Sequence, residues 1–240
     1  MNAIKFELPF AMKKQLNKDT HTFYFDRSAF NFHYLAGQYF RVTLKIEDPD
    51  DRGSSRYFTQ SSSPTDQFLT ITTRVIKSSF KLRLNSLKPG ERMTFFGPFG
   101  DVVQTEKDIT PKIFLAGGIG MTPAHSMLKF IDAKKLKVNF TLLVSFPTIE
   151  EVIFYDELKE IQKRNQNITV VYSLTKQDNI PEGFEKGRIN DKLIEKYARN
   201  FKKSKIFITG PIEMAKAIEQ TVVKMGASES QIVFEDFPGY

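Results

Sequence analysis

The residues best placed to do chemistry are three glycines near the middle of the chain, Gly117, Gly118 and Gly120. An apolar run at residues 113–116 precedes them, and a helical pattern begins at residues 122–123. A strand, a glycine turn and a helix start, in that order, present backbone N–H groups to a phosphate. Gly118 and Gly120 also let the backbone pass close to a ligand or adopt a positive φ. The motif predicts a nucleotide site, and a tight strand-to-helix turn without a ligand is the alternative.

The start of the helix after this turn is marked by Thr122 and Pro123. We expect Thr122 to cap the helix by accepting a hydrogen bond from a backbone N–H two or three residues on. Pro123 suits the first helical position, where its missing N–H costs nothing. One apolar stripe then follows at helical spacing: Ala124, Met127, Leu128 and Ile131.

The two halves of the chain differ in rhythm, which predicts two domains, residues 1–105 and 106–240. The first half is a series of short β-rich runs separated by turn residues, and this pattern indicates an antiparallel barrel or sandwich. In the second half, apolar runs alternate with helical stretches, which predicts a parallel sheet covered on both faces. We expect strands near 22–25, 38–46, 56–59, 68–75, 92–96, 113–116, 139–144, 168–173, 206–209 and 231–234, and helices near 80–87, 123–135, 150–164, 190–200 and 211–225.

Composition excludes several classes of protein. The 240 residues include no Cys and three His, so we expect no disulfide framework, no thiolate metal site and no other metal site. The histidines are expected at the surface or in packing. No run approaches the roughly 20 apolar residues of a membrane helix. The N-terminus lacks the pattern of a signal peptide, so we expect a soluble, cytoplasmic protein.

The net charge is +7, from 35 basic and 28 acidic residues, and the excess lies mainly in the first half. A basic patch attracts anionic partners and speeds their encounter, so this half either docks an acidic partner or is a solvated face. We do not expect nucleic-acid binding, because the basic residues are not interleaved with a platform of stacking aromatics. The basic stretch consists of Arg74, Lys77, Lys81, Arg83, Lys88 and Arg92, and Glu91 is the one acidic residue within it.

With the segment 56–62 added, the chain resembles the ferredoxin–NADP reductase superfamily. The flavin motif of that family reads Arg, any residue, Tyr, Ser, two residues, Ser. Here Arg56 and Ser62 match it, whereas Phe58 stands where Tyr is usual and Thr59 where Ser is usual. Residues 117–123 match the nicotinamide motif without a break. Further matches, in the order of the family, are residues 36–39, 87–90, 97–100, 210–214 and 235–240.

The resemblance implies a six-stranded antiparallel flavin-binding barrel followed by a parallel-sheet nicotinamide-binding domain. Arg56 would offer a fixed fork of donors to the flavin phosphates. Phe58 would lie against the isoalloxazine ring, and the hydroxyl of Thr59 would lie near flavin N5. Ser78 and Ser79 would offer backbone N–H groups to a phosphate, and ordinary helix capping is the alternative for them.

The resemblance also implies roles near the end of the chain. Thr209 stands where many relatives have a Cys that helps to place the nicotinamide. Glu235 matches a carboxylate near the flavin that could relay a proton, or is a solvated glutamate. Phe237 would cover the flavin face that the nicotinamide must reach. The predicted catalytic residues are Thr59, Thr209 and Glu235, and the predicted cofactor-binding residues are Arg56, Tyr57, Phe58, Thr59, Ser62, Thr72, Thr73, Ser78, Ser79, Gly117, Gly118, Gly120, Met121, Thr122, Pro123, Thr209, Gly210, Pro211 and Phe237.

The implied activity is hydride transfer from NADH or NADPH to bound FAD, followed by electron release to a separate acceptor. Residues 145–148 offer no arginine for a 2′-phosphate after the second strand of the rear domain, which favours NADH. Lys176 or Arg188 could reverse that preference. FAD is preferred to FMN. An acidic ferredoxin or flavodoxin would suit the basic stretch, with free flavin, ferric complexes or an oxygenase component as rival acceptors. A basic binding module without catalysis is the alternative from another class.

Overall fold

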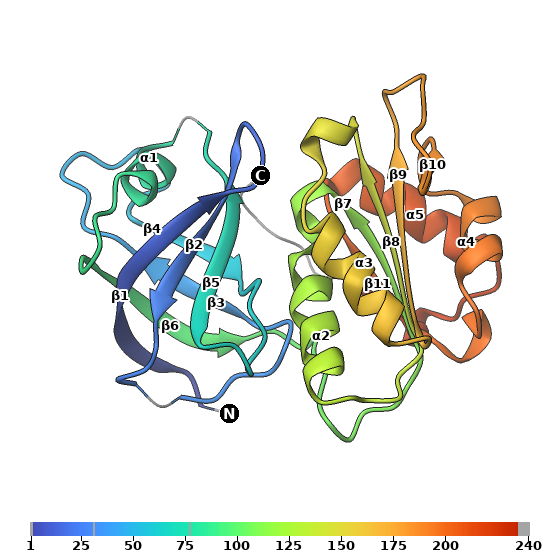
Figure 1. Ribbon diagram of the computed structural model, residues 1–240, viewed down its shortest axis with the longest axis horizontal. Coiled ribbons are helices and arrows are strands. Elements are labelled where there is room, and N and C mark those ends of the chain that lie inside the picture. Colours follow the sequence, from blue (N-terminus) through green and yellow to red (C-terminus); the bar gives the residue numbers. More distant parts are fainter. Residues whose placement is uncertain (1, 31, 77, 235–240) are drawn as a thin grey trace.

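Two six-stranded sheets, one from each half of the chain, form a two-domain molecule (Figure 1). The computed structural model describes residues 2–30, 32–76 and 78–234. The front sheet is antiparallel and the rear sheet is parallel and covered by helices, so the predicted fold class is confirmed. The predicted boundary after residue 105 lies between the last strand of the front sheet and the first strand of the rear sheet.

The front domain is an antiparallel half-barrel with strand order β4-β3-β6-β1-β2-β5. The strand that carries the predicted flavin motif, β4, therefore lies at one edge of the sheet. The strands are β1 (Ile4–Gln15), β2 (Thr20–Asp26), β3 (Tyr39–Thr43), β4 (Ser55–Thr59), β5 (Phe68–Arg74) and β6 (Arg92–Phe99), and a short helix, α1 (Ser79–Asn85), lies between β5 and β6.

An aromatic core holds this sheet together. The rings of Phe6 and Phe95 stack at 5.5 Å between centroids, and Phe40 meets both of them edge-on. Such pairs add about 0.5–1.5 kcal/mol each beyond the burial of their surface. The strand that carries Phe6, β1, was not among those the sequence predicted, because a proline within a run (Pro9) argues against a strand and the last three residues are polar, although Phe6, Leu8 and Phe10 alternate inward.

The rear domain is a parallel sheet with strand order β10-β9-β8-β7-β11-β12. Its central strands are buried on both faces; every residue of β7 (Lys112–Gly117) and of β8 (Phe140–Phe146) is buried. Near-continuous apolar strands of this kind are typical of a sheet covered by helices on both sides. The remaining strands are β9 (Ile168–Leu174), β10 (Phe184–Lys186), β11 (Lys205–Thr209) and β12 (Ile232–Phe234).

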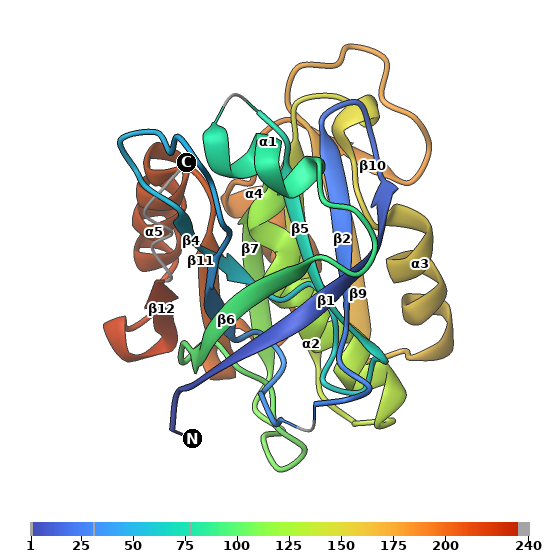
Figure 2. The ribbon, with the colours of Figure 1, turned by 90° about the vertical axis from the view of Figure 1, so that its left-hand side faces the viewer.

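The helices divide between the two faces of this sheet. The face nearer the barrel carries α2 (Thr122–Ala133) and α3 (Tyr155–Arg164), and the opposite face carries α4 (Asp191–Tyr197) and α5 (Ile212–Lys224) (Figures 1 and 2). Each layer has its own apolar cluster. None of the helices described in residues 2–234 combines the length and the apolar character that crossing a membrane requires.

The predicted cap at Thr122 is wrong. A 3-10 helix, η1 (Gly118–Met121), runs directly into α2, so the chain is already helical when it reaches Thr122. Met121 occupies the cap position and no side chain caps the helix. The apolar stripe that begins at Ala124 is confirmed, since all four of its residues are fully buried.

Direct contacts fix the two domains against each other. The hydroxyl of Ser126, on α2, donates to the carbonyl oxygen of Ser62 at 2.6 Å and accepts from the N–H of Gly37 at 3.3 Å. Gly37 has φ +101°, and a Cβ there would lie 2.1 Å from the carbonyl oxygen of Val102. Only glycine lets the backbone approach this closely, so the interface depends on the residue type at position 37.

Candidate functional site

The glycine turn lies where β7 ends. Gly118 has φ +53°, the left-handed conformation that glycine adopts without strain. Gly120 has no positive φ, but a Cβ there would lie 3.1 Å from the backbone nitrogen of Gly210. The turn therefore packs directly against the chain that leaves β11, and the close approach expected of Gly120 is to backbone.

A cavity of about 510 Å³ opens beside this turn. Gly117 and Gly118 line it together with residues at the carboxyl ends of other strands of the parallel sheet, Ser145 near the end of β8 and Gly210 just after β11. Ligands of parallel sheets bind outside the carboxyl ends of the strands. The rest of the lining is Arg74, Ile119, Phe146, Pro147, Thr175, Arg188, Ile189, Pro211, Glu213, Met214, Ala217 and Ile218.

Two arginines give this cavity its positive charge. Arg188 comes from the segment between β10 and α4, and Arg74 comes from β5 of the front domain. Arg74 also forms an ion pair with Glu151 of the rear domain at 2.9 Å, so it bridges the two domains at the rim. Arg74 is a site residue that sequence reasoning missed, because nothing in a barrel strand indicates which residue reaches across to another domain.

The side chain of Thr209 is tied to the glycine turn. Its hydroxyl donates to the carbonyl oxygen of Gly120 at 2.8 Å, and the residue is almost fully buried. Pro211 follows and occupies the cap position of α5. The structure thus brings Thr209, Gly210 and Pro211 to the nicotinamide motif, as the resemblance implied, and gives the threonine hydroxyl a structural partner there.

On the front domain, Arg56 is fully engaged by its own chain. Nη1 donates to three carbonyl oxygens at 2.8 Å each, those of Arg52, Gly53 and Ser55. Nη2 donates to Oδ1 of Asp50, also at 2.8 Å. The side chain is 11% exposed, and Nε is buried without a hydrogen-bond partner among the described residues.

Ser79 meets the same aspartate. Its N–H donates to Oδ2 of Asp50 at 3.1 Å, and its hydroxyl accepts from the Asp50 N–H at 2.9 Å. Ser78 caps α1 by accepting from the N–H of Lys81, so the capping alternative holds for its side chain. Partial burial raises the pKa of Asp50, but hydrogen bonds from Arg56 and Ser79 outweigh burial and hold that pKa below its usual value.

The aromatic residues of the flavin motif lie on opposite faces of β4. Phe58 packs against the barrel core and lies 5.9 Å from Phe80, ring to ring. Tyr57 is half exposed and meets Tyr39 edge-on. Thr59 is 5% exposed, and its hydroxyl is buried with no partner among the described residues. An orphaned buried hydroxyl is uncommon and calls for a ligand or a stated role.

Two predicted flavin residues, Ser62 and Thr72, bond other hydroxyls in a buried network, and a third, Thr73, bonds a backbone carbonyl. The hydroxyl of Thr72 bonds those of Thr22 and Ser61 at 2.8 Å each. Ser62 accepts from the N–H of Thr70 and contacts the Tyr34 hydroxyl, and Thr73 donates to its neighbour's carbonyl. Since Ser62, Thr72 and Thr73 already have these partners, their role toward flavin stays a prediction.

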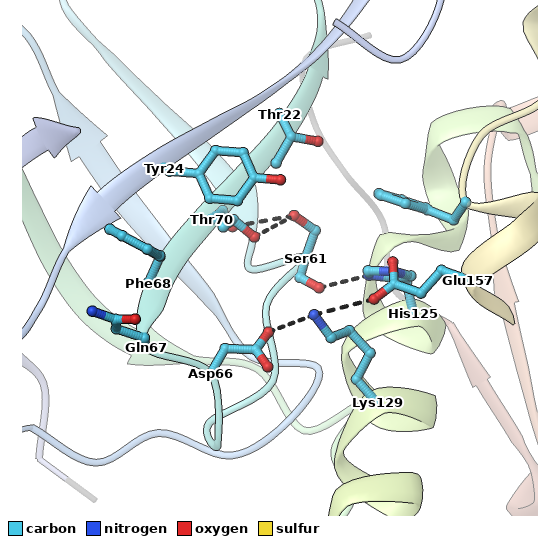
Figure 3. Close-up of a pocket in the computed structure, with 11 residues that line it drawn as sticks. Thr22, Tyr24, Ser61, Asp66, Gln67, Phe68, Thr70, His125, Lys129 and Glu157 are labelled. Atoms are coloured by element: carbon cyan, nitrogen blue, oxygen red, sulfur yellow. Dashed lines mark hydrogen bonds and ion pairs between the residues drawn. The ribbon is translucent and has the colours of Figure 1, made fainter. Parts of the chain in front are cut away.

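Beside this network a polar pocket of about 280 Å³ lies between the domains (Figure 3). His125, on α2, places Nδ1 2.7 Å from the Ser61 carbonyl oxygen and Nε2 2.8 Å from Glu157. Lys129 bridges Asp66 at 2.7 Å and Glu157 at 3.3 Å. The two ion pairs of Lys129 connect the barrel to α2 and α3. Both ring nitrogens of His125 also contact neighbouring groups, so His125 is a packing histidine at the domain interface.

The basic stretch of the front domain is largely neutralised. Arg83 pairs with Glu91, Arg92 pairs with Glu7 at 3.3 Å, and Arg74 pairs with Glu151. Lys81 is 8% exposed; burial, and then the positive charges of nearby arginines, lower its pKa to about 8. The free positive surface is therefore smaller than the sequence indicated. Glu235 and Phe237 lie outside the described residues.

Comparison with known proteins agrees with both halves of this description. Residues 114–220 match the family model described as an oxidoreductase NAD-binding domain. Flavohemoprotein A of Dictyostelium discoideum is 27% identical over 218 residues, which cover 85% of this chain and 52% of that protein. The chain spans about half the length of the curated relatives it matches.

Solved structures share the complete fold. A ferredoxin NADP+ reductase from Neisseria gonorrhoeae with bound FAD and NADP superimposes with a TM-score of 0.78 at 20% identity, over 96% of this chain and 98% of that one. The FAD/NAD binding domain of nitric oxide dioxygenase from Vibrio cholerae gives 0.80 at 16% identity, over 95% and 97%. The fold is therefore shared with these two solved structures. The match of residues 114–220 to the NAD-binding family model agrees with the resemblance to the ferredoxin–NADP reductase superfamily that the motifs indicated.

Proposed function

We propose that the protein is an NAD(P)H-dependent flavin oxidoreductase, with FAD held by the front barrel and the nicotinamide held by the rear domain. The observation that carries this proposal is the cavity at the glycine turn, which is lined by both domains and holds Arg74 and Arg188. A site built in this way suits a ligand that bears phosphates and must reach the neighbouring domain. The bound FAD and NADP of the Neisseria gonorrhoeae structure support the same pairing.

The residues of the front domain fit a flavin. The buried Thr59 hydroxyl and the buried Nε of Arg56 both lack partners among the described residues, and a bound flavin would supply them. Arg56 would hold phosphate, Phe58 would support the ring, and Thr59 would hydrogen-bond at N5. The chemistry that the two cofactors supply when bound is transfer of a hydride from nicotinamide C4 to flavin N5.

On the nicotinamide side, the residues of this chain position and shield. The N–H groups of the turn at Gly118 and Gly120 would face the diphosphate, and Thr209 would hold the turn in place through the carbonyl of Gly120. We propose NADH as the preferred reductant, since residues 145–148 carry no cation. Two cations could hold a 2′-phosphate, Arg188 and Lys176. Arg188 lines the cavity, whereas Lys176 is not part of that lining.

The finer proposal concerns the acceptor, which we take to be a separate acidic electron-transfer protein such as a ferredoxin or flavodoxin. The net charge of +7 supports it. The ion pairs of Arg83 with Glu91 and of Arg92 with Glu7 reduce the positive charge that is free to dock an acidic protein. For this reason free flavin or a ferric complex is the second candidate acceptor.

Absorbance spectroscopy tests the proposal. The purified protein, or the protein reconstituted with FAD, is expected to be yellow and to bleach anaerobically on addition of NADH, and more slowly with NADPH. Arg56→Ala is expected to lose flavin. A protein that stays colourless when offered FAD would favour the binding-module alternative. Reoxidation of the bleached protein by ferredoxin, flavodoxin, riboflavin or ferric citrate, compared at low and high salt, then separates the acceptors.

A further inference from the structure

One carboxylate holds two groups that the family resemblance implies for the flavin phosphates, the Arg56 side chain and the Ser79 N–H. Asp50 lies in the loop between β3 and β4, and its two oxygens accept separately from Nη2 of Arg56 and from the N–H of Ser79. The two donors come from different elements, β4 and α1, and converge on this single residue. A phosphate presents the same geometry, since its oxygens accept from an arginine fork and a backbone N–H at once.

Arg56 already donates to one anion, the carboxylate of Asp50. Nη1 already donates to three carbonyl oxygens, those of Arg52 and Gly53 in the loop and of Ser55 at the start of β4, which leaves the Nε–Nη2 edge for an incoming ligand. Nη2 on that edge already donates to Asp50, and Nε is buried. A phosphate therefore reaches the edge only after a neighbouring group has moved, and Asp50 is the neighbour that holds it.

The surrounding charge would favour an anion in either form. Arg52, Arg56 and Lys81 lie close enough together for the arginines to lower the pKa of the buried lysine. Asp50 is the carboxylate that pairs with Arg56 in this cluster. Removal of its charge takes this carboxylate away from Arg56, and a phosphate could take its place.

We propose that Asp50 is an internal competitor for the phosphate group of the flavin, and that it thereby sets the flavin affinity of the protein. The inference rests on the proposed function. When the flavin binds, its phosphate replaces the Asp50 carboxylate on Arg56. The free energy gained from the phosphate contacts is therefore reduced by the free energy of the Asp50 contacts that are lost. A flavin held in this way dissociates more readily than one bound to an unpaired arginine.

Titration of the apoprotein with FAD, FMN and riboflavin, followed by flavin fluorescence, tests the proposal without measuring activity. Asp50→Asn keeps the side-chain shape and one acceptor oxygen, and is expected to tighten FAD binding on the order of tenfold, the equivalent of one charge-assisted hydrogen bond after screening. Riboflavin, which has no phosphate, is expected to bind the variant and the wild type alike. Asp51→Asn is the matched control, because it removes the same charge one residue away and is expected to leave the FAD affinity unchanged.

Two outcomes overturn the inference alone: Asp50→Asn binds FAD no better than wild type, or it binds riboflavin tighter by the same factor as FAD. If neither wild type nor variant binds any flavin, the proposed function itself fails. Should Asp50→Asn not fold, as judged by its thermal unfolding, Asp50→Ser replaces it with the same expected result.

Discussion

The hydroxyl of Thr209 donates a hydrogen bond of 2.8 Å to the carbonyl oxygen of Gly120, and so connects the end of β11 to the nicotinamide turn. The resemblance implies a cysteine at the equivalent place in many relatives, and a thiol is a weak donor. Threonine is the stronger donor, and its hydroxyl gives the buried carbonyl oxygen of Gly120 a hydrogen-bond partner.

Thr209→Val is expected to lower the free energy of unfolding by about 1–3 kcal/mol, because it leaves a buried carbonyl without its partner. Thr209→Ser keeps the donor and is expected to cost less. Urea denaturation measures both, and a valine variant as stable as wild type would contradict the structural role. Because the bond orders the turn, we also expect the valine variant to raise KM for the nicotinamide.

Thr59 is expected to behave in the opposite way. Its hydroxyl is buried without a partner among the described residues, so Thr59→Val removes an unsatisfied group and leaves the apoprotein as stable or more stable. The rate of flavin reduction is expected to fall on the order of a hundredfold in the same variant, if the hydroxyl acts at N5. Thr59→Ser is the control and retains the rate. Stopped-flow reduction that is equally fast in the valine variant would remove Thr59 from the catalytic residues.

Gly120→Ala tests the packing of the turn against the chain after β11. The added Cβ would lie 3.1 Å from N and 3.2 Å from Cα of Gly210, so backbone must shift, at a cost of about 1–3 kcal/mol. Gly226→Ala is the comparison, since its Cβ meets nothing within 4 Å and it reports only the strain of φ +91°. Nicotinamide affinity is expected to fall in the first variant and to stay unchanged in the second. Equal affinities in the two variants would show that the turn does not bind the ligand.

The two cations weighed for the 2′-phosphate separate in the structure, which permits a paired test. Arg188 lines the cavity and Lys176 does not, so Arg188→Ala is expected to lower kcat/KM for NADPH on the order of tenfold more than for NADH. Lys176→Ala is expected to leave the ratio unchanged. Steady-state rates with both nicotinamides measure it, and the idea fails when the arginine variant loses both activities in equal proportion.

Glu157 gives the domain interface a predictable response to acid. Burial raises its pKa, but the hydrogen bond from His125 and the charges of His125 and Lys129 prevail and lower that pKa from 4.5 to about 2. A carboxyl group with a lower pKa in the folded state stabilises the protein fully above pH 4.5, and loses that contribution as the pH falls toward about 2.

Glu157→Gln is therefore expected to be less stable than wild type at pH 7 by about 1 kcal/mol, a value discounted because the side chain is 44% exposed. The difference should shrink steadily between pH 4.5 and pH 2. Urea unfolding at several pH values measures it. A difference that stays constant over this range would mean that the ion pairs with His125 and Lys129 contribute nothing through charge.

Local patterns predicted the fold well, since strands and helices are short-range features of sequence. The central strand β7 and the stripe that begins at Ala124 follow directly from apolar periodicity. The long strand β1 was not predicted, because a proline within the run argues against a strand. The cap predicted at Thr122 was wrong because the preceding turn is itself helical. Such local overrides are decided by tertiary packing rather than by the residues concerned.

Motifs located part of the candidate site, but they did not show which distant segments of the chain meet there. Gly118 was identified from the glycine turn and Thr209 from the resemblance; Gly118 lines the cavity and Thr209 bonds the turn beside it. Arg74 and Asp50 were not identified as site residues. Arg74 reaches the cavity from the front domain, and Asp50 contacts Arg56 from the loop between β3 and β4. Contacts between segments far apart in the sequence leave no periodic signal in either of them.

The hydroxyl of Ser126 receives the N–H of Gly37 and donates to the carbonyl of Ser62, so three separate stretches of chain meet at one oxygen atom. Together with the ion pairs Arg74–Glu151 and Lys129–Asp66, this junction holds the two halves in place, whatever the length of the connecting peptide around residues 105–110. Extra residues inserted there should loop out into solvent, while the contacts between the two domains keep their geometry.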